Sequence, residues 1–168
     1  MRAAEVVQKR FLLDKVLFIP SYTPPHKNSV DIASAVHRLR MVEIALRRYP
    51  KFIPCSIEIE AKGRSYSILT LNKLKEYYPE AELFFILGVD AFLEIDTWRD
   101  YEQVLKRCYF VVITRPGYQL EDAKGILGGK YKEKIYALRF SEVVEGNLVS
   151  SFNIFLLPIE ALDVASTE

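Results

Sequence analysis

The chain has 168 residues, of which 50% are hydrophobic and 27% charged, and its formal net charge is +1 at neutral pH. This length and balance predict a single globular domain over residues 1–168 and exclude an intrinsically disordered chain. A net charge so close to zero predicts neither a nucleic-acid-binding nor a membrane-binding surface, so any anion site must be local.

The cysteines and the apolar runs indicate the compartment. Cys55 and Cys108 stand far apart, each within an apolar, strand-like run. They could pair with each other, but buried reduced thiols in a cytosolic protein fit the sequence better. No apolar run approaches the length of a membrane span, and the first residues do not form an apolar signal region. We therefore expect a soluble, cytoplasmic protein.

Hydrophobic periodicity and turn residues predict alternating helices and strands. In chain order we expect a helix over 2–12, a strand over 15–20, a proline-containing loop over 21–31, a helix over 33–49, a strand over 52–60, a helix over 66–78, and strands over 83–87 and 109–114. Residues 119–134 predict a weak helix or an exposed excursion, and 137–144 and 153–157 are further candidate strands. This alternation predicts an α/β fold with a three-layer, Rossmann-like parallel sheet.

Two of the predicted helices have features that can be placed from the sequence. The helix over 33–49 has an apolar stripe, which consists of Val36, Leu39, Val42, Leu46 and Tyr49. This stripe should face the core, and His37 should lie at the surface. Ser65 precedes the helix over 66–78 and is a candidate N-cap.

The two central strands both end in polar and turn residues. The strand over 83–87 leads into Gly88-Val89-Asp90, and the strand over 109–114 leads into Arg115-Pro116-Gly117. In open α/β sheets, ligands bind outside the carboxyl ends of the strands. Gly88 would let a ligand approach the backbone, and Asp90 could hold a ribose hydroxyl or, equally, cap the following helix. The pattern indicates an enzyme that acts on nucleotides.

Three further segments could carry chemistry, each with an ordinary structural alternative. Pro24-Pro25-His26-Lys27 could present a phosphate-binding lysine and a histidine donor, or it could be a surface turn. Ser65-Tyr66-Ser67 offers hydroxyls and N–H groups for a carboxylate or phosphate, or it could simply cap a helix. Trp98 and Arg99 could stack on a planar ring and neutralise its charge, or Trp98 could pack the edge of the core.

Taken together, the order of these segments resembles the bacterial nicotinate-mononucleotide adenylyltransferases, of the nucleotidyltransferase superfamily. The matching segments are FIPSYTPPHK at 18–27, HRLRM at 37–41, GRSYSILTL at 63–71, FFILGVDAF at 84–92, TW at 97–98 and ITRPGY at 113–118. The likeness covers nearly the whole chain in the right order, and the combination is more specific than any one segment.

The resemblance implies an adenylyltransferase fold and a reaction in NAD biosynthesis. AMP would pass from ATP to nicotinate mononucleotide, which gives nicotinate adenine dinucleotide and pyrophosphate, with Mg²⁺ as cofactor. The mononucleotide phosphate would attack the α-phosphate directly, so positioning and charge stabilisation would matter more than a nucleophilic side chain. The implied partners are ATP and nicotinate mononucleotide, with no nucleic acid or membrane, and the family is compatible with a homo-oligomer.

On the ATP side, the resemblance implies roles for two groups of residues. Gly88 and Asp90 would contact the adenosine, and Arg115 would lie near it. The segment VASTE at the end of the chain resembles the start of the family's I-S-S-T-x-I-R segment, which adds Ser166 and Thr167 to the ATP-binding set.

On the acceptor side, the resemblance implies that Trp98 stacks on the pyridine ring. Ser67 stands where the family usually has threonine, which keeps the hydroxyl. Ser67 and the backbone around Arg99 would address the nicotinate carboxylate. Lys27, with His26 beside it, would face the phosphates.

The sequence departs from the family at its catalytic motif, G-G-T-F-D-P-x-H-x-G-H. The only two histidines, His26 and His37, do not form an H-x-G-H pair, so the catalytic residues are unknown. We expect a chain truncated at both ends, without the first central strand, and nearly inactive by itself. The alternatives are a related nucleotidyltransferase with another acceptor, such as pantetheine phosphate, and a non-catalytic remnant that at most binds nucleotide.

Overall fold

The structure is a computed structural model that describes residues 1–23, 33–139, 141–144 and 146–159. The chain divides into two compact units. Unit 1 comprises residues 1–12, 82–97 and 105–168, and unit 2 comprises residues 13–81 and 98–104. Within the described residues, no helix is long and apolar enough to cross a membrane.

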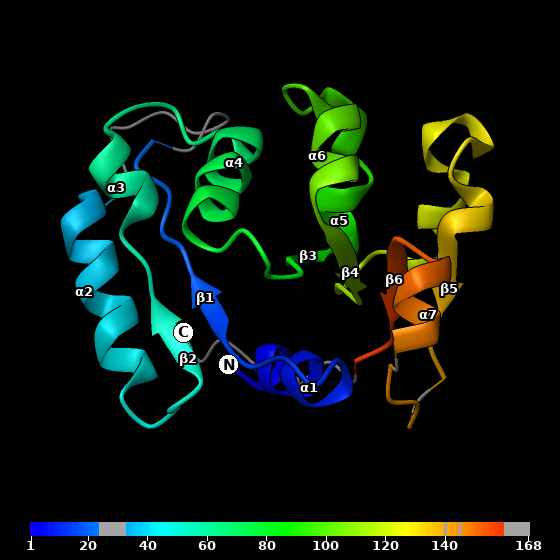
Figure 1. Cartoon of the computed structure of the whole chain (residues 1–168), viewed down its shortest axis with the longest axis horizontal. Coiled ribbons are helices and arrows are strands. Elements are labelled where there is room, and N and C mark those ends of the chain that lie inside the picture. Colours follow the sequence, from blue (N-terminus) through cyan, green and yellow to red (C-terminus); the bar gives the residue numbers. More distant parts are fainter. Residues whose placement is uncertain (24–32, 140, 145, 160–168) are drawn as a thin grey trace. The chain divides into compact units, whose positions relative to one another are not determined.

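Unit 1 contains a parallel sheet whose strand order is β3-β4-β6-β5 (Figure 1). Its strands are β3 (Phe84–Gly88), β4 (Tyr109–Ile113), β5 (Ile135–Ala137) and β6 (Ile154–Leu157). Every residue of β6 is buried, as are Phe110, Val111 and Val112 in β4. Such continuous burial is typical of central strands in parallel sheets that are covered on both faces.

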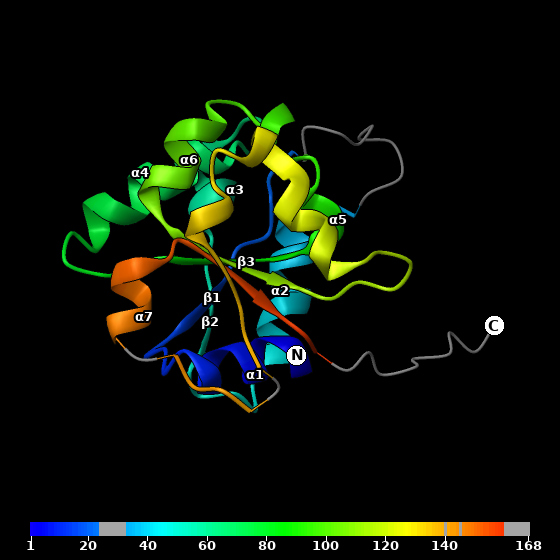
Figure 2. The same cartoon turned by 90° about the vertical axis from the view of Figure 1, so that its right-hand side faces the viewer.

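Unit 1 also contains α-helices and 3₁₀ helices. They are α1 (Arg2–Arg10), α5 (Val89–Phe92), α6 (Tyr101–Arg107), which begins in unit 2, and α7 (Gly146–Ser151), together with the 3₁₀ helices η2 (Ile95–Thr97), η3 (Leu120–Gly129) and η4 (Lys132–Lys134). Phe11, after α1, packs its ring against Phe84 at 5.4 Å and Phe155 at 5.2 Å. α5 contacts both β3 and β4, and α7 leads into β6, whose arrow points away from it (Figure 2).

Unit 2 is built on two parallel strands, β1 (Val16–Phe18) and β2 (Phe52–Pro54). Its helices are α2 (Ala35–Leu46), α3 (Ile57–Ala61) and α4 (Ser67–Tyr77). α2 runs beside β2 (Figure 1), and α3 contacts α4. Ser34 caps α2, because its Oγ accepts the His37 N–H at 3.3 Å. His37 is exposed, as predicted.

The α/β fold with parallel sheets is confirmed, whereas the strand predicted over 52–60 is wrong in its second half. The strand ends at Pro54, which has no N–H to donate to a ladder. The following residues form the short helix α3, in which the Glu60 N–H bonds to the Ser56 carbonyl at 2.9 Å. The finer expectation, a three-layer Rossmann-like sheet, stays a prediction.

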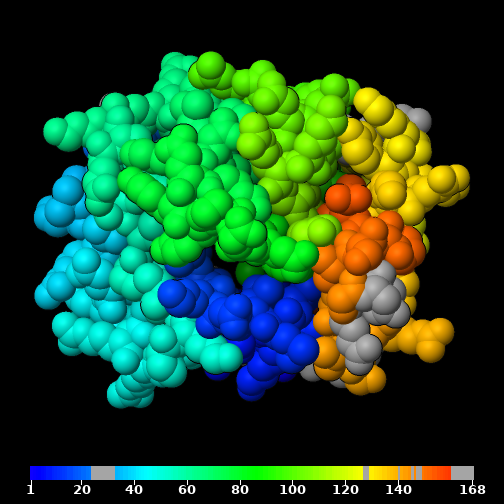
Figure 3. Space-filling model, viewed as in Figure 1, coloured from blue at the N-terminus to red at the C-terminus, as the bar shows by residue number. Residues whose placement is uncertain are grey.

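The segment 119–134, expected as a weak helix or an exposed excursion, contains the 3₁₀ helices η3 and η4. Two smaller expectations change. The strand expected over 137–144 does not form among its described residues, since β5 stops at Ala137. Val36 does not face the core with the rest of its predicted stripe, because its side chain is 65% exposed on α2, the light-blue helix at the surface in Figure 3.

Candidate functional site

The carboxyl end of β3 brings Gly88 and Asp90 together in unit 1. Gly88 is the last residue of β3, and Asp90 lies in the first turn of α5. A Cβ at Gly88 would overlap the Asp90 Oδ1 and stand 3.7 Å from the Arg115 Cδ. Gly88 has a φ of −71°, so its role is to make room for the carboxylate rather than to adopt an unusual backbone conformation. The N-cap of α5 is Gly88, and therefore Asp90 does not cap that helix.

Arg115 reaches the same place from the neighbouring strand β4. Its Nε lies 3.3 Å from the Asp90 Oδ2. The side chains of Arg115 and Asp90 are 61% and 33% exposed, so the pair is open to solvent and is worth at most about 1 kcal/mol. Because the ion pair is weak, either side chain can leave its partner and contact a ligand instead at a small energetic cost.

A turn after β4 holds Arg115 in position. The Tyr118 N–H donates to the Arg115 carbonyl at 3.1 Å, and Gly117 has a φ of +85°. Proline at the second position and glycine with positive φ at the third are typical of a type II turn. The structure therefore confirms the prediction that a strand leads into a turn at Arg115-Pro116-Gly117.

Thr114 ties the end of β4 to the chain that leaves β6. Its Oγ1 donates to the Ile159 carbonyl at 2.5 Å and accepts the Ile159 N–H at 3.0 Å. The sheet register places Gly88 opposite Ile113, and Ile113 opposite Leu157. The ends of three parallel strands thus lie side by side, with Asp90 and Arg115 at this edge. Ser166 and Thr167 lie outside the described residues.

In unit 2, the start of α4 differs from the sequence prediction. The Ser65 Oγ accepts the Tyr22 N–H at 2.8 Å, and the Ser65 N–H donates to the Thr23 carbonyl at 3.1 Å. Ser65 therefore fastens the loop before α4 instead of capping the helix. Tyr66 is the N-cap, and its side chain makes no capping hydrogen bond. The first N–H groups of a helix have no intrahelical acceptor, so Ser67 begins α4 where a negative group would be stabilised.

Arg99 lies over the ring of Tyr66, the residue directly before Ser67. The guanidinium carbon is 4.9 Å from the ring centroid, and the Arg99 Nε lies 3.5 Å from the Asp100 Oδ2. Trp98 is half-buried. The structure thus brings Arg99 to the residue that precedes α4. His26 and Lys27 lie outside the described residues.

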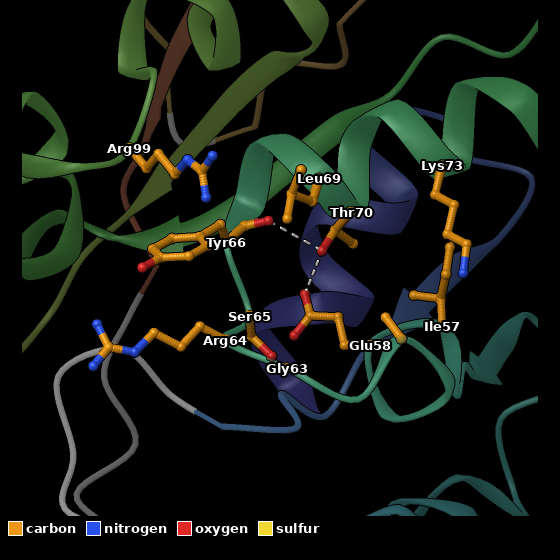
Figure 4. Close-up of a pocket in the computed structure, with 11 residues that line it drawn as sticks. Ile57, Glu58, Gly63, Arg64, Ser65, Tyr66, Leu69, Thr70, Lys73 and Arg99 are labelled. Atoms are coloured by element: carbon orange, nitrogen blue, oxygen red, sulfur yellow. Dashed lines mark hydrogen bonds between the residues drawn. The ribbon is translucent and has the colours of Figure 1, made fainter.

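A pocket of about 320 Å³ opens beside Tyr66 and Arg99 (Figure 4). It is lined by Ile57, Glu58, Ala61, Gly63, Arg64, Ser65, Tyr66, Leu69, Thr70, Lys73 and Arg99. Of the predicted acceptor residues, Arg99 lines it, whereas Ser67 and Trp98 do not. Sequence reasoning missed Glu58, whose carboxylate accepts the Thr70 hydroxyl at 2.6 Å, because Glu58 stands in an alternating pattern that predicts a strand.

The carboxyl ends of the strands are where open α/β sheets bind their ligands, and here they carry a glycine, a carboxylate and an arginine. The model of the cytidylyltransferase-like family matches residues 1–156. The chain therefore belongs to the cytidylyltransferase-like family and, through its relatives, to the nicotinate-nucleotide adenylyltransferases.

Two of these relatives cover essentially the whole chain. A probable nicotinate-nucleotide adenylyltransferase of Shewanella pealeana is 34% identical over 168 residues, which are 100% of this chain and 74% of that protein. A protein of the same name from Desulfatibacillum aliphaticivorans is 39% identical over 171 residues, which cover 99% of this chain and 78% of that one.

A solved structure shares the fold. It is the Plasmodium falciparum nicotinic acid mononucleotide adenylyltransferase in complex with NaAD, with a TM-score of 0.63 at 17% identity, and the match covers 96% of this chain and 70% of that chain.

Proposed function

We propose that this chain acts in the transfer of AMP from ATP to nicotinate mononucleotide, which yields nicotinate adenine dinucleotide and pyrophosphate. The observation that carries the proposal is that relatives named for this activity align over the full chain at 34% and 39% identity. The edge formed by Gly88, Asp90 and Arg115 supports it, because this is where a parallel α/β sheet takes a nucleotide.

On the ATP side, Asp90 would accept hydrogen bonds from ribose hydroxyls, and Arg115 would meet a phosphate. Gly88 supports this role because it leaves the space that the Asp90 carboxylate occupies. The solvent-open ion pair between Asp90 and Arg115 supports it too, since each partner can be exchanged for a ligand group at small cost. Ser166 and Thr167 belong to this proposal on the sequence alone.

On the acceptor side, Trp98 would stack on the pyridine ring, and Ser67 would address the nicotinate carboxylate. The start of α4 supports this role, because its first N–H groups and the helix dipole favour a negative charge next to the Ser67 hydroxyl. The Arg99 guanidinium over Tyr66 adds a positive charge one residue away from Ser67. His26 and Lys27 remain proposed phosphate contacts.

We propose that these residues act by positioning the two substrates. The mononucleotide phosphate attacks the α-phosphate of ATP in line, and pyrophosphate leaves, so the protein has to align two anions and offset their charge. Among the described residues, no three His, Cys, Asp or Glu side chains are grouped to hold a metal ion. Mg²⁺ is usually held by one or two carboxylates together with substrate phosphates, and we propose it as the companion of the ATP phosphates.

One experiment separates this proposal from its two alternatives. The chain is mixed with ATP, Mg²⁺ and either nicotinate mononucleotide or pantetheine phosphate; pyrophosphate release is recorded, and binding is measured by calorimetry. Binding of nicotinate mononucleotide supports the proposed acceptor, and pyrophosphate release with it supports the transfer. Preference for pantetheine phosphate would favour another acceptor. Nucleotide binding without any pyrophosphate would favour a non-catalytic role for these 168 residues.

Two further parts of the proposal rest on the family alone. They are a cytoplasmic location and a homo-oligomeric state. Sedimentation of the purified chain measures the second directly, and a monomer at all concentrations would contradict it.

A further inference from the structure

We infer that Thr114 is a positioning residue for Arg115 at the carboxyl edge of the unit 1 sheet. Its hydroxyl fixes the backbone directly before Arg115, so that the Arg115 side chain is presented to a phosphate. This role deepens the proposed function and rests on it for the identity of the anion, ATP. The fixing of Arg115 itself rests on the contacts within unit 1.

The main-chain ladder between β4 and β6 ends just before Thr114. Its last pair is Ile113 opposite Leu157, and the next pair in the same parallel register would be Thr114 and Pro158. Proline has no N–H to donate, which is a physical reason for the ladder to end here. Beyond this point, a side chain links the two segments.

The Thr114 hydroxyl makes that link with both main-chain groups of one residue. Its Oγ1 donates to the Ile159 carbonyl at 2.5 Å and accepts the Ile159 N–H at 3.0 Å. Thr114 and Ile159 are half-buried, and hydrogen bonds shielded from water are stronger than exposed ones. The backbone at Thr114 is therefore fixed relative to the chain that leaves β6.

Arg115 needs such a fixed backbone, because its side chain is 61% exposed and packing does little to orient it. The backbone is held on both sides: Thr114 is bonded to Ile159 before it, and the Tyr118 N–H donates to the Arg115 carbonyl at 3.1 Å after it. The Arg115 Nε then lies 3.3 Å from the Asp90 Oδ2. Without the Thr114 bonds, Arg115 should sample more positions and lose more freedom when it binds a phosphate.

Calorimetric titration of the full chain with ATP, tripolyphosphate and adenosine tests this role. Thr114→Val keeps the β-branched shape and removes both hydrogen bonds, so it should weaken ATP and tripolyphosphate binding about fivefold. Adenosine has no phosphate and should bind within about twofold of the unchanged chain. Thr114→Ser keeps the hydroxyl and should bind all three ligands normally. Unchanged tripolyphosphate binding in Thr114→Val, or an equal loss for adenosine, would overturn the inference.

Ser150→Ala is the matched control. The Ser150 hydroxyl donates to the Gly146 carbonyl at 2.9 Å within α7. This helix precedes β6, so Ser150 stands before the start of the strand and Thr114 is bonded beyond its end. The control also loses a hydroxyl hydrogen bond in unit 1, and it should bind all three ligands within about twofold of the unchanged chain. Equal losses in Ser150→Ala and Thr114→Val would contradict a specific role of Thr114.

A second measurement needs no ligand. The NMR signal of the Arg115 Nε–H should shift in Asp90→Asn, because this substitution removes the ion pair. Thr114→Val should shift the signal in the same direction, since the pair would form less often, and Thr114→Ser should not. If the chain bound no ATP, the proposed function would fail, but this signal would still test the positioning of Arg115. An unchanged signal in Thr114→Val would overturn the inference.

Discussion

Asp90 and Arg115 meet across the ends of two neighbouring strands, with the Arg115 Nε 3.3 Å from the Asp90 Oδ2. Asp90 follows β3, Arg115 follows β4, and the two strands pair in parallel as far as Gly88 and Ile113. The pair depends on Gly88, because any Cβ there would overlap the Asp90 carboxylate. One glycine thus determines the shape of the edge at which we place ATP.

Replacing Gly88 by alanine tests this dependence. The added methyl should displace the Asp90 carboxylate and weaken ATP binding about tenfold, measured by calorimetry. The free energy of unfolding should change by no more than about 1 kcal/mol, since the displaced group is the end of a half-exposed side chain. Gly125→Ala is the control, because a Cβ there meets no atom within 4 Å. Unchanged ATP affinity in Gly88→Ala would contradict the proposed role of this edge.

Ser67 is the residue with which we expect the chain to recognise the acceptor. Ser67→Ala should weaken binding of nicotinate mononucleotide about fivefold, because one hydrogen bond to a charged group is lost. Ser67→Thr, which restores the residue usual in the family, should bind it like the unchanged chain. ATP affinity should be the same in all three proteins. If the alanine variant bound nicotinate mononucleotide normally, the hydroxyl would have no part in recognition.

The Tyr136–Glu142 pair predicts a pH dependence of stability. The Tyr136 hydroxyl donates to Glu142 at 2.6 Å, and this bond, with the Arg139 N–H, lowers the pKa of Glu142 below its ordinary 4.5. A carboxyl whose pKa is lower in the folded state stabilises the fold above its unfolded pKa, and this contribution is lost as the pH falls through the folded pKa.

Urea unfolding of the unchanged chain and of Glu142→Gln measures that contribution. We expect the variant to be less stable at a pH of about 7 and the difference to shrink as the pH falls below 4.5 and through the lowered pKa of Glu142, where the carboxylate loses its charge. Glu133→Gln, an exposed glutamate in η4, is the control and should show no such trend. A stability difference that grows on acidification would mean that folding raises the pKa of Glu142 instead of lowering it.

The two thiols should react at different rates. Burial raises the pKa of Cys108 to about 12, so almost none of it is thiolate at neutral pH. Cys55 is half-buried. A disulfide reagent should therefore modify Cys55 rapidly and Cys108 only after unfolding, and Cys55→Ser should abolish the rapid phase. Two equally rapid phases would show that Cys108 is accessible in the folded chain.

The site residues at the strand ends could be predicted from the sequence because local rules determine them. Gly88 and Asp90 follow an apolar run, and Arg115 precedes a Pro-Gly turn that admits few conformations. The parallel α/β fold follows from alternation along the chain in the same way. These features depend on residues that are adjacent in the sequence, so they can be predicted from it.

The sequence predictions fail where a contact distant in sequence decides, or where the observed structure overrides the apolar pattern. Ser65 has the residue type of an N-cap, but its hydroxyl bonds to the N–H of Tyr22, 43 positions away. Val36 fits the apolar stripe of its helix, yet its side chain is exposed. Glu58 alternates with isoleucines like a strand residue, but Pro54 ends β2 and leaves Glu58 to bond with Thr70. The pocket could not be predicted, because the sequence pattern predicts a strand where α3 forms.

The most direct test of the proposed function uses Trp98, the only tryptophan in the chain. The full chain is titrated with nicotinate mononucleotide, nicotinamide mononucleotide and pantetheine phosphate while tryptophan fluorescence is recorded. If Trp98 stacks on the pyridine ring next to the start of α4, nicotinate mononucleotide should quench the emission saturably and at the lowest concentration of the three. No change with nicotinate mononucleotide, or an equal response to pantetheine phosphate, would contradict the assignment of the acceptor.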